Sequence, residues 1–196
     1  MYNLSQYIVE KLKLNKDIKK EYNYFPKDKK ELMDILYDKF HKEGKDADLS
    51  DIDTSNITEV VELFLKASRE FNALGFENID LSHWDMSNVK DSSYMFSGCT
   101  KLKSIGDVSS WDMSNVTTME QMFYHCRNLN IDNSGLENWD VSNVKNFRSM
   151  FMHSDKVNFD LKKWKINKDA EVSDMIGDCI SFSEDNIPLD LPKNAR

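Results

Sequence analysis

One segment of the sequence recurs at nearly regular intervals, and this repetition constrains the fold more than any other feature. Residues 84–96, 111–123 and 139–151 each begin with Trp-Asp-x-Ser-Asn-Val and end with Met-Phe. Residues 52–64 are a weaker copy, and residues 164–176 are an eroded one. A unit this short cannot bury its own apolar face, so neighbouring units must stack and share one core.

The spacing of apolar residues divides each unit into two halves. Before the tryptophan, apolar and polar residues alternate, as around Ile79 and Leu81, and a period of two predicts a short strand. After the asparagine, apolar residues recur every three or four positions, which predicts a helix. Thr117 and Glu120 fit a capping box at the start of one such helix. The expected fold is an α/β solenoid, a leucine-rich-repeat-like stack of about five short strand-plus-helix units.

The two ends of the chain depart from the repeat. Residues 1–45 predict two helices, one carrying Leu4, Ile8 and Leu12 and one that opens at residues 26–28 and stops at Gly44. We expect residues 1–45 to form a helical N-terminal cap and residues 46–196 to form the solenoid. Residues 188–192 predict a final strand bounded by prolines, which would close the C-terminal end.

Charge and hydropathy exclude several classes of function. Residues 46–196 contain 26 acidic and 15 basic residues, which argues against binding to a nucleic-acid backbone. No apolar run approaches the length of a membrane-spanning helix, and the first residues are polar, so we expect neither a membrane anchor nor a signal peptide. The expected location is the cytoplasm of a bacterial or host cell, or a virion. The odd number of cysteines, three, predicts reduced thiols.

Equivalent residues of stacked units form columns, and each column is a candidate site. The tryptophan column could be an aromatic platform for a ligand, but its even spacing from the inward strand residue favours the core. A column of small residues follows the end of each unit, and tight packing explains it better than a metal or catalytic role. The tryptophan column contains Ile52, Trp84, Trp111, Trp139 and Trp164. The small-residue column contains Ala67, Cys99, Cys126, Ser154 and Cys179.

Two further polar columns are predicted to cap turns of the backbone. One is the aspartate that follows the tryptophan position, for which a calcium ladder is the alternative. Lys165 replaces that aspartate in the fifth unit, which argues against calcium. The aspartate column comprises Asp53, Asp85, Asp112 and Asp140. The second is an asparagine column, which comprises Asn56, Asn88, Asn115, Asn143 and Asn167.

One acidic column has no obvious role in the core and is the candidate binding site. It lies four residues before the tryptophan position, where alternation directs the side chains outward onto the expected concave face. Stacked like charges repel, so the column costs stability unless it meets solvent or a cationic partner. A solvated face is the competing interpretation. The column contains Asp48, Asp80, Asp107, Asp160 and Asp190, with Gly135 in one unit.

No pattern in the sequence indicates catalysis. The four histidines share no metal-ligand spacing, and neither a nucleophile elbow nor a glycine-rich phosphate loop is present. We therefore expect no enzymatic activity, no cofactor and no metal.

The Trp-Asp-x-Ser-Asn-Val unit, ending in Met-Phe with a cysteine three residues later, resembles the BspA-like leucine-rich repeats of mycoplasma-type lipoproteins. The resemblance covers about residues 46–192 and implies a non-enzymatic surface protein that binds other proteins. Because the first residues are polar and the first cysteine is Cys99, we expect neither the signal peptide nor the lipidation cysteine of that family. Residues 4–12 resemble leaders of proteins from tailed gut bacteriophages.

The expected function is binding of a protein partner, a basic one, through the acidic concave face. The alternative is a structural or packaged virion component of a bacteriophage, docked through its N-terminal helix. Neither hypothesis involves nucleic acid or a membrane.

Overall fold

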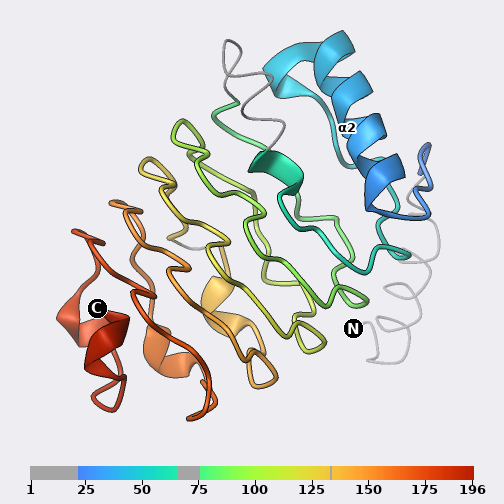
Figure 1. Cartoon of the computed structure of the whole chain (residues 1–196). Coiled ribbons are helices and arrows are strands. Elements are labelled where there is room, and N and C mark those ends of the chain that lie inside the picture. The colour runs from blue at the N-terminus through green and yellow to red at the C-terminus, as the bar shows by residue number, and fades with distance from the viewer. Residues whose placement is uncertain (1–21, 66–75, 133) are drawn as a thin grey trace, which may run out of the picture.

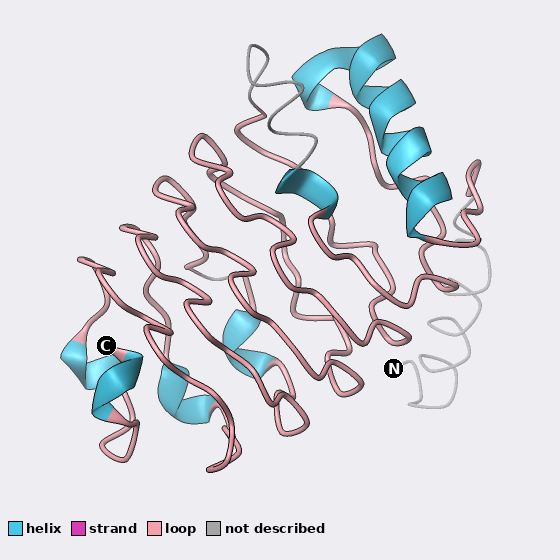
Figure 2. Ribbon diagram, viewed as in Figure 1, coloured by secondary structure: helices cyan, strands magenta, loops and turns pink. Residues whose placement is uncertain are grey.

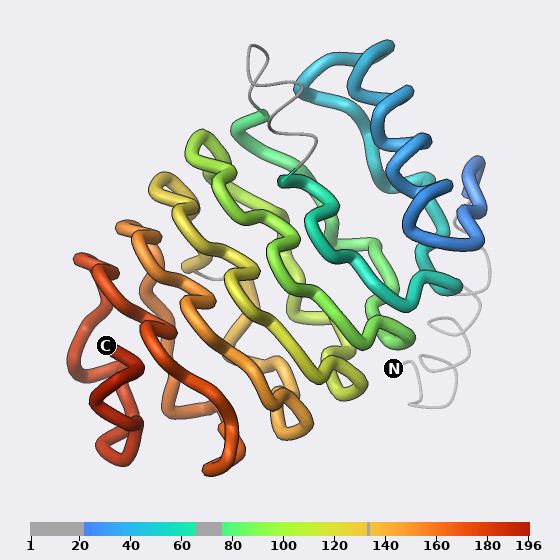
Figure 3. The backbone as a smooth tube through the Cα atoms, viewed as in Figure 1, coloured from blue at the N-terminus to red at the C-terminus, as the bar shows by residue number. Residues whose placement is uncertain are grey.

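The computed structural model describes residues 22–65, 76–132 and 134–196. The chain winds into successive coils that lie side by side, so that each repeat contacts the next (Figure 1, Figure 3). The one long helix in this part of the chain, α2 (Lys29–Glu43), lies at one end of the stack, and the C-terminal segment lies at the other. The first predicted helix, around Leu4 and Leu12, falls outside the described residues.

The expected strand-plus-helix units are wrong. The described residues form no strand, as Figure 2 makes plain, and neighbouring repeats meet only at isolated parallel bridges. Short 3₁₀ helices occur at η1 (Gly44–Asp46), η2 (Leu136–Asn138), η3 (Leu161–Lys163), η4 (Glu184–Asn186) and η5 (Lys193–Ala195). The structure is therefore not an α/β solenoid but a stack of turns and loops, with α2 covering one end and a short helical segment at residues 63–65 (Figure 2).

Backbone geometry explains why the segments predicted as helices are not helical in the repeats that begin at Trp84, Trp111, Trp139 and Trp164. In residues 92–98, alternate N–H groups close turns within the repeat, and the others donate to the next repeat. Met95 N donates to Ser92 O at 3.3 Å, whereas Phe96 N donates to Met122 O at 2.9 Å. Tyr94 has φ of 59°, in the left-handed region that interrupts a helix. Successive turns thus place apolar residues inward every three or four positions, as a helix would.

The same left-handed conformation recurs at the equivalent position of the following repeats. Gln121, Ser149 and Asp174 have φ of 50°, 51° and 54°. Such a conformation costs roughly 1–2 kcal/mol for an ordinary residue. The hydrogen bonds between repeats compensate for it, because they give the backbone groups of the turns partners in the neighbouring repeat.

The predicted capping box at Thr117 and the predicted closing strand at residues 188–192 are also wrong. Thr117 Oγ1 donates to Lys90 O of the preceding repeat at 3.1 Å, so it does not form a capping box with Glu120. Residues 188–192 form turns instead of a closing strand, and Leu189 is fully exposed. The chain end still pairs with the last repeat, since Ile176 N donates to Ala195 O at 2.8 Å.

Aromatic columns fill the core of the stack. The phenylalanines that end successive repeats lie almost parallel, with ring centroids 5.1 Å apart for Phe64 and Phe96 and 5.2 Å apart for Phe96 and Phe123. Trp111 and Trp139 stack at 5.7 Å. Each repeat therefore buries its aromatic side chains against those of its neighbours, which makes the core continuous.

Helix α2 confirms the predicted second helix. Asp28 accepts the Glu31 N–H at 2.9 Å as the N-cap, and Gly44 follows the last helical residue with φ of 78°. The helix buries Leu32, Leu36 and Phe40 against the first repeats, and Phe40 stacks on Phe76 at 5.4 Å.

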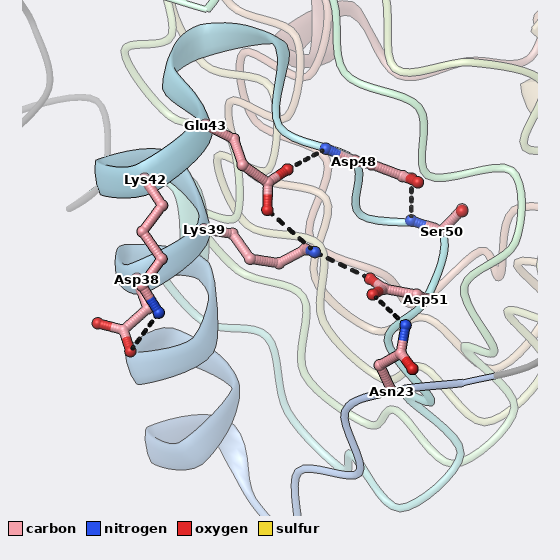
Figure 4. Close-up of polar contacts among 8 residues, drawn as sticks. All are labelled: Asn23, Asp38, Lys39, Lys42, Glu43, Asp48, Ser50 and Asp51. Carbon is pink, nitrogen blue, oxygen red and sulfur yellow. Dashed lines mark hydrogen bonds and ion pairs between the residues drawn. The ribbon is translucent and has the colours of Figure 1, made fainter.

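A buried lysine connects α2 to the first repeat (Figure 4). Lys39 Nζ lies 3.0 Å from Asp51 Oδ1 and 3.5 Å from Glu43 Oε1, and Asn23 Nδ2 donates to Asp51 Oδ2 at 3.0 Å. Burial opposes ionisation, but the hydrogen bond and charge of Asp51, together with Glu43, raise the pKa of Lys39 above its usual value. Removing one partner would leave an uncompensated buried charge.

Candidate functional site

The acidic column predicted from the sequence lies on exposed turns, and its carboxylates bond to their own backbone. Each of four aspartates accepts the N–H of the residue two positions later, the geometry of an Asx-turn. Asp80 Oδ1 accepts from Ser82 N at 3.0 Å, and Asp107 Oδ1 accepts from Ser109 N at 3.0 Å. Asp48 and Asp160 accept from Ser50 N at 2.8 Å and Lys162 N at 3.2 Å. We call these four residues the Asp column; Asp190, also exposed, makes no such bond within the described residues.

The turn geometry accounts for the charge state of one member of the column. The hydroxyl and backbone N–H of Ser109 hold the pKa of Asp107 below its ordinary value. Hydrogen bonding therefore outweighs the desolvation that opposes ionisation at this position. The carboxylate is ionised at neutral pH.

Gly135 interrupts the Asp column because of a close contact. Its φ is 86°, and a Cβ atom there would lie 2.3 Å from Ser109 Cβ. Any side chain at this position would collide with the preceding repeat. The gap in the column is thus required by packing.

The aspartates after the tryptophans are confirmed as backbone caps. Asp85, Asp112 and Asp140 accept the N–H of the serine two residues later, at 2.8, 3.0 and 3.0 Å. The hydrogen bonds from Ser114 and Ser142 lower the pKa values of Asp112 and Asp140. A local bond thus explains each recurring carboxylate without a calcium ion.

The asparagine column bonds between repeats instead of capping its own turn. Asn88, Asn115 and Asn143 donate through Nδ2 to the carbonyls of Ser55, Ser87 and Ser114 in the preceding repeats, at 2.8, 2.7 and 2.8 Å. Asn167 was placed in this column but lies one position earlier in its repeat. Its Oδ1 accepts from Asp169 N at 3.0 Å.

The tryptophan column is confirmed as core. Trp111 is only 3% exposed, and its indole N–H donates to Leu81 O of the preceding repeat at 3.0 Å. Trp139 and Trp164 bond in the same way to Val108 O and Leu136 O, at 3.0 and 2.9 Å. These rings are therefore not available as a platform for a ligand.

The small-residue column has a hydrogen-bonding role that sequence reasoning missed. Its cysteine and serine side chains donate to the phenylalanine carbonyl of the preceding repeat, and Ala67 lies outside the described residues. Cys126 Sγ donates to Phe96 O at 3.1 Å, and Ser154 Oγ donates to Phe123 O at 2.5 Å. The exchange of cysteine for serine was the available signal, because both side chains are small donors. The three cysteines are free, as predicted.

A pocket of about 490 Å³ at the C-terminal end brings together Cys179, His153 and Asp178. His153 Nδ1 lies 3.5 Å from Asp178 Oδ2. Cys179 Sγ donates to Phe151 O at 2.8 Å, and burial raises the pKa of this thiol to about 12. A nucleophilic cysteine needs a lowered pKa, so this arrangement supplies no activated thiolate.

A second group of residues that sequence reasoning missed lies beside the fifth repeat. Lys162, Lys165 and Lys168 line a pocket of about 390 Å³ together with Trp164 and Leu191. The signal was present in the sequence, because Lys165 and Lys168 replace an aspartate and an asparagine of the repeat.

Comparison with known families places the chain. The family described as "Mycoplasma protein of unknown function, DUF285" matches three times, over residues 2–106, 31–135 and 69–189. The chain belongs to this family. The overlapping DUF285 matches agree with the internal repetition and support a repeat protein. No curated protein and no solved structure matches the chain.

The described residues also contain no helix that combines the length and the apolar composition needed to cross a bilayer.

Proposed function

We propose that this DUF285 protein is a non-enzymatic protein-binding module that recognises a basic segment of a partner through the Asp column. One observation carries the proposal. Four repeats present an aspartate at the same position, exposed in three of them and half-buried at Asp160, and in each the same local hydrogen bond fixes the carboxylate. A row of fixed negative charges, interrupted only at Gly135, complements a chain segment that carries lysine or arginine.

The Asx-turns favour binding because they organise the charges in advance. One carboxylate oxygen of each aspartate accepts the backbone N–H, so the side chain does not have to be ordered when a partner binds. The excess of acidic residues in residues 46–196 supports the same choice of partner, because a negative potential accelerates encounter with a basic surface.

The nucleophile candidates are consistent with a non-enzymatic role. Burial raises the pKa of Cys126 well above that of a free thiol, and that of Cys179 to about 12. Neither thiol therefore provides a thiolate at neutral pH.

Selection from a random peptide-display library tests the proposal. We expect the immobilised chain to enrich peptides rich in lysine and arginine, and the variant D80N/D107N/D160N to lose that enrichment. Asparagine keeps the turn, because Asn130 and Asn146 already accept the N–H two residues later, at 2.8 and 2.9 Å. The variant therefore removes charge without removing the cap.

A matched control separates the Asp column from overall charge. The variant D132N/D169N/D185N changes net charge equally, at exposed aspartates whose carboxylates cap no such turn. It should retain the enrichment. Equal loss in both variants, or enrichment of peptides that are not basic, would overturn the proposal.

The finer classification is also a proposal. The Trp-Asp-x-Ser-Asn-Val motif supports a relationship to the BspA-like proteins, and residues 4–12 support a bacteriophage source. We further propose a cytoplasmic or virion location, with no nucleic acid or membrane as partner.

A further inference from the structure

The fifth repeat reverses the charge of the repeats before it. Asp85, Asp112 and Asp140 follow their tryptophans, but Lys165 follows Trp164. Lys168 likewise stands where the earlier repeats have the asparagine that bonds to the preceding repeat. The turn cap and the bond between repeats are both absent here, so the fold gains nothing visible from these lysines.

The positive charges form no ion pair in the part of the chain that the structure describes. Lys162, Lys165 and Lys168 are exposed, and none lies within ion-pair distance of a carboxylate there, although the charge of Lys165 helps to lower the pKa of Asp140. Lys163, by contrast, lies 3.8 Å from Glu137. Three exposed cations on one short segment of an acidic protein indicate a surface that attracts negative charge.

These three lysines surround a pocket with apolar walls. The pocket has a volume of about 390 Å³ and lies between the fifth repeat and the C-terminal segment. Ile166, Ala170 and Pro188, which are half-buried, contribute its accessible apolar surface, and Asp190 also lines it. Its volume falls in the range of ligand pockets, roughly 300–1,000 Å³.

We propose that this pocket binds an acidic peptide segment of a partner protein, with one apolar side chain packed against Ile166, Ala170 and Pro188. The lysines pair with carboxylates on either side of that residue. A peptide fits better than a small anion, because an anion would leave the apolar walls uncovered and would meet the charge of Asp190. Asp190 can instead accept a backbone N–H of the peptide. The site is opposite in charge to the Asp column and does not depend on it.

Fluorescence anisotropy with a labelled acidic peptide that contains a central leucine tests the site on the full chain. The variant K162Q/K165Q/K168Q should weaken binding about tenfold, because each exposed ion pair contributes only modestly. The variant K30Q/K90Q/K156Q changes net charge equally at exposed lysines elsewhere and should bind as the wild type does. K165D, which restores the aspartate of the other repeats, should weaken binding without lowering the melting temperature.

Two further binding measurements identify the class of ligand. Replacing the leucine of the peptide by serine should weaken binding, and inorganic phosphate should not displace the peptide at equal concentration. Displacement by phosphate would indicate a small-anion site and overturn the proposal. No binding of the peptide, equal weakening by the control variant, or self-association of the chain through this pocket would also overturn it.

Discussion

Ser154 links its own repeat to the preceding one, and its removal gives the sharpest test of the structure. The side chain is completely buried. Its hydroxyl donates to Phe123 O at 2.5 Å and accepts from Cys126 N at 3.0 Å. Ser154→Ala therefore removes two hydrogen bonds and leaves the Cys126 N–H with only its longer bond to Phe123 O, at 3.3 Å.

The expected cost follows from these two contacts. Each buried hydrogen bond contributes about 0.5–1.5 kcal/mol. Ser154→Ala should then lower the free energy of unfolding by about 1–3 kcal/mol. For a domain of this size the melting temperature should fall by about 2–12 °C.

Urea denaturation followed by tryptophan fluorescence measures the effect, and two variants control it. Ser154→Cys should cost less, because Cys99 and Cys126 occupy equivalent positions in the preceding repeats. Ser181→Ala, at an exposed serine, should leave stability unchanged. If Ser154→Ala unfolds within about 0.5 kcal/mol of the wild type, as an ordinary surface substitution does, the hydrogen bonds between repeats do not have the role assigned to them.

Three further predictions concern the core, the thiols and acid stability. Trp111→Ala should lower the free energy of unfolding by about 3–5 kcal/mol, because it removes a buried ring and its hydrogen bond to Leu81 O. An unchanged midpoint in urea denaturation would contradict the assignment of Trp111 to the core. Burial raises the pKa values of Cys126 and Cys179, so both should react slowly with a thiol reagent at pH 8 in the folded protein. All three cysteines should react rapidly after unfolding. Fast labelling of Cys126 in the folded protein would refute the packing. Folding lowers the pKa of Asp112, so its contribution to stability is complete above the ordinary value of 3.8 and is lost as pH falls through the folded value. The difference in urea midpoint between wild type and Asp112→Asn should therefore shrink from pH 7 to pH 3, and a constant difference would show that ionisation is irrelevant.

The sequence alone determined the repeat boundaries, the inward-facing residues and helix α2. The tryptophan column is core because aromatic residues at constant positions must be buried when units stack. Helix α2 begins at Asp28 and ends before Gly44 as predicted, because its caps and its apolar stripe are local signals. The aspartates after the tryptophans were likewise predictable as caps, since an Asx-turn involves residues only two positions apart.

The tertiary structure decided what lies between those positions. Apolar residues spaced by three and four, such as Val116, Met119 and Phe123, suit a helix and a run of turns equally. The choice depends on whether alternate N–H groups bond within the segment or to the next repeat. Gln121 N donates to Arg148 O at 2.9 Å, and that carbonyl exists only when the repeats are stacked.

The candidate sites also depend partly on the sequence and partly on the tertiary structure. The Asp column was visible in the sequence because one residue type recurs at one position. Its bonds to Ser82 and Ser109 required the backbone, since turn geometry sets where each carboxylate lies. The lysine pocket needed the tertiary structure, because Leu191 reaches Trp164 only when the C-terminal segment folds back over the fifth repeat. Local chemistry determined which residues recur, and contacts between distant segments determined what they form together.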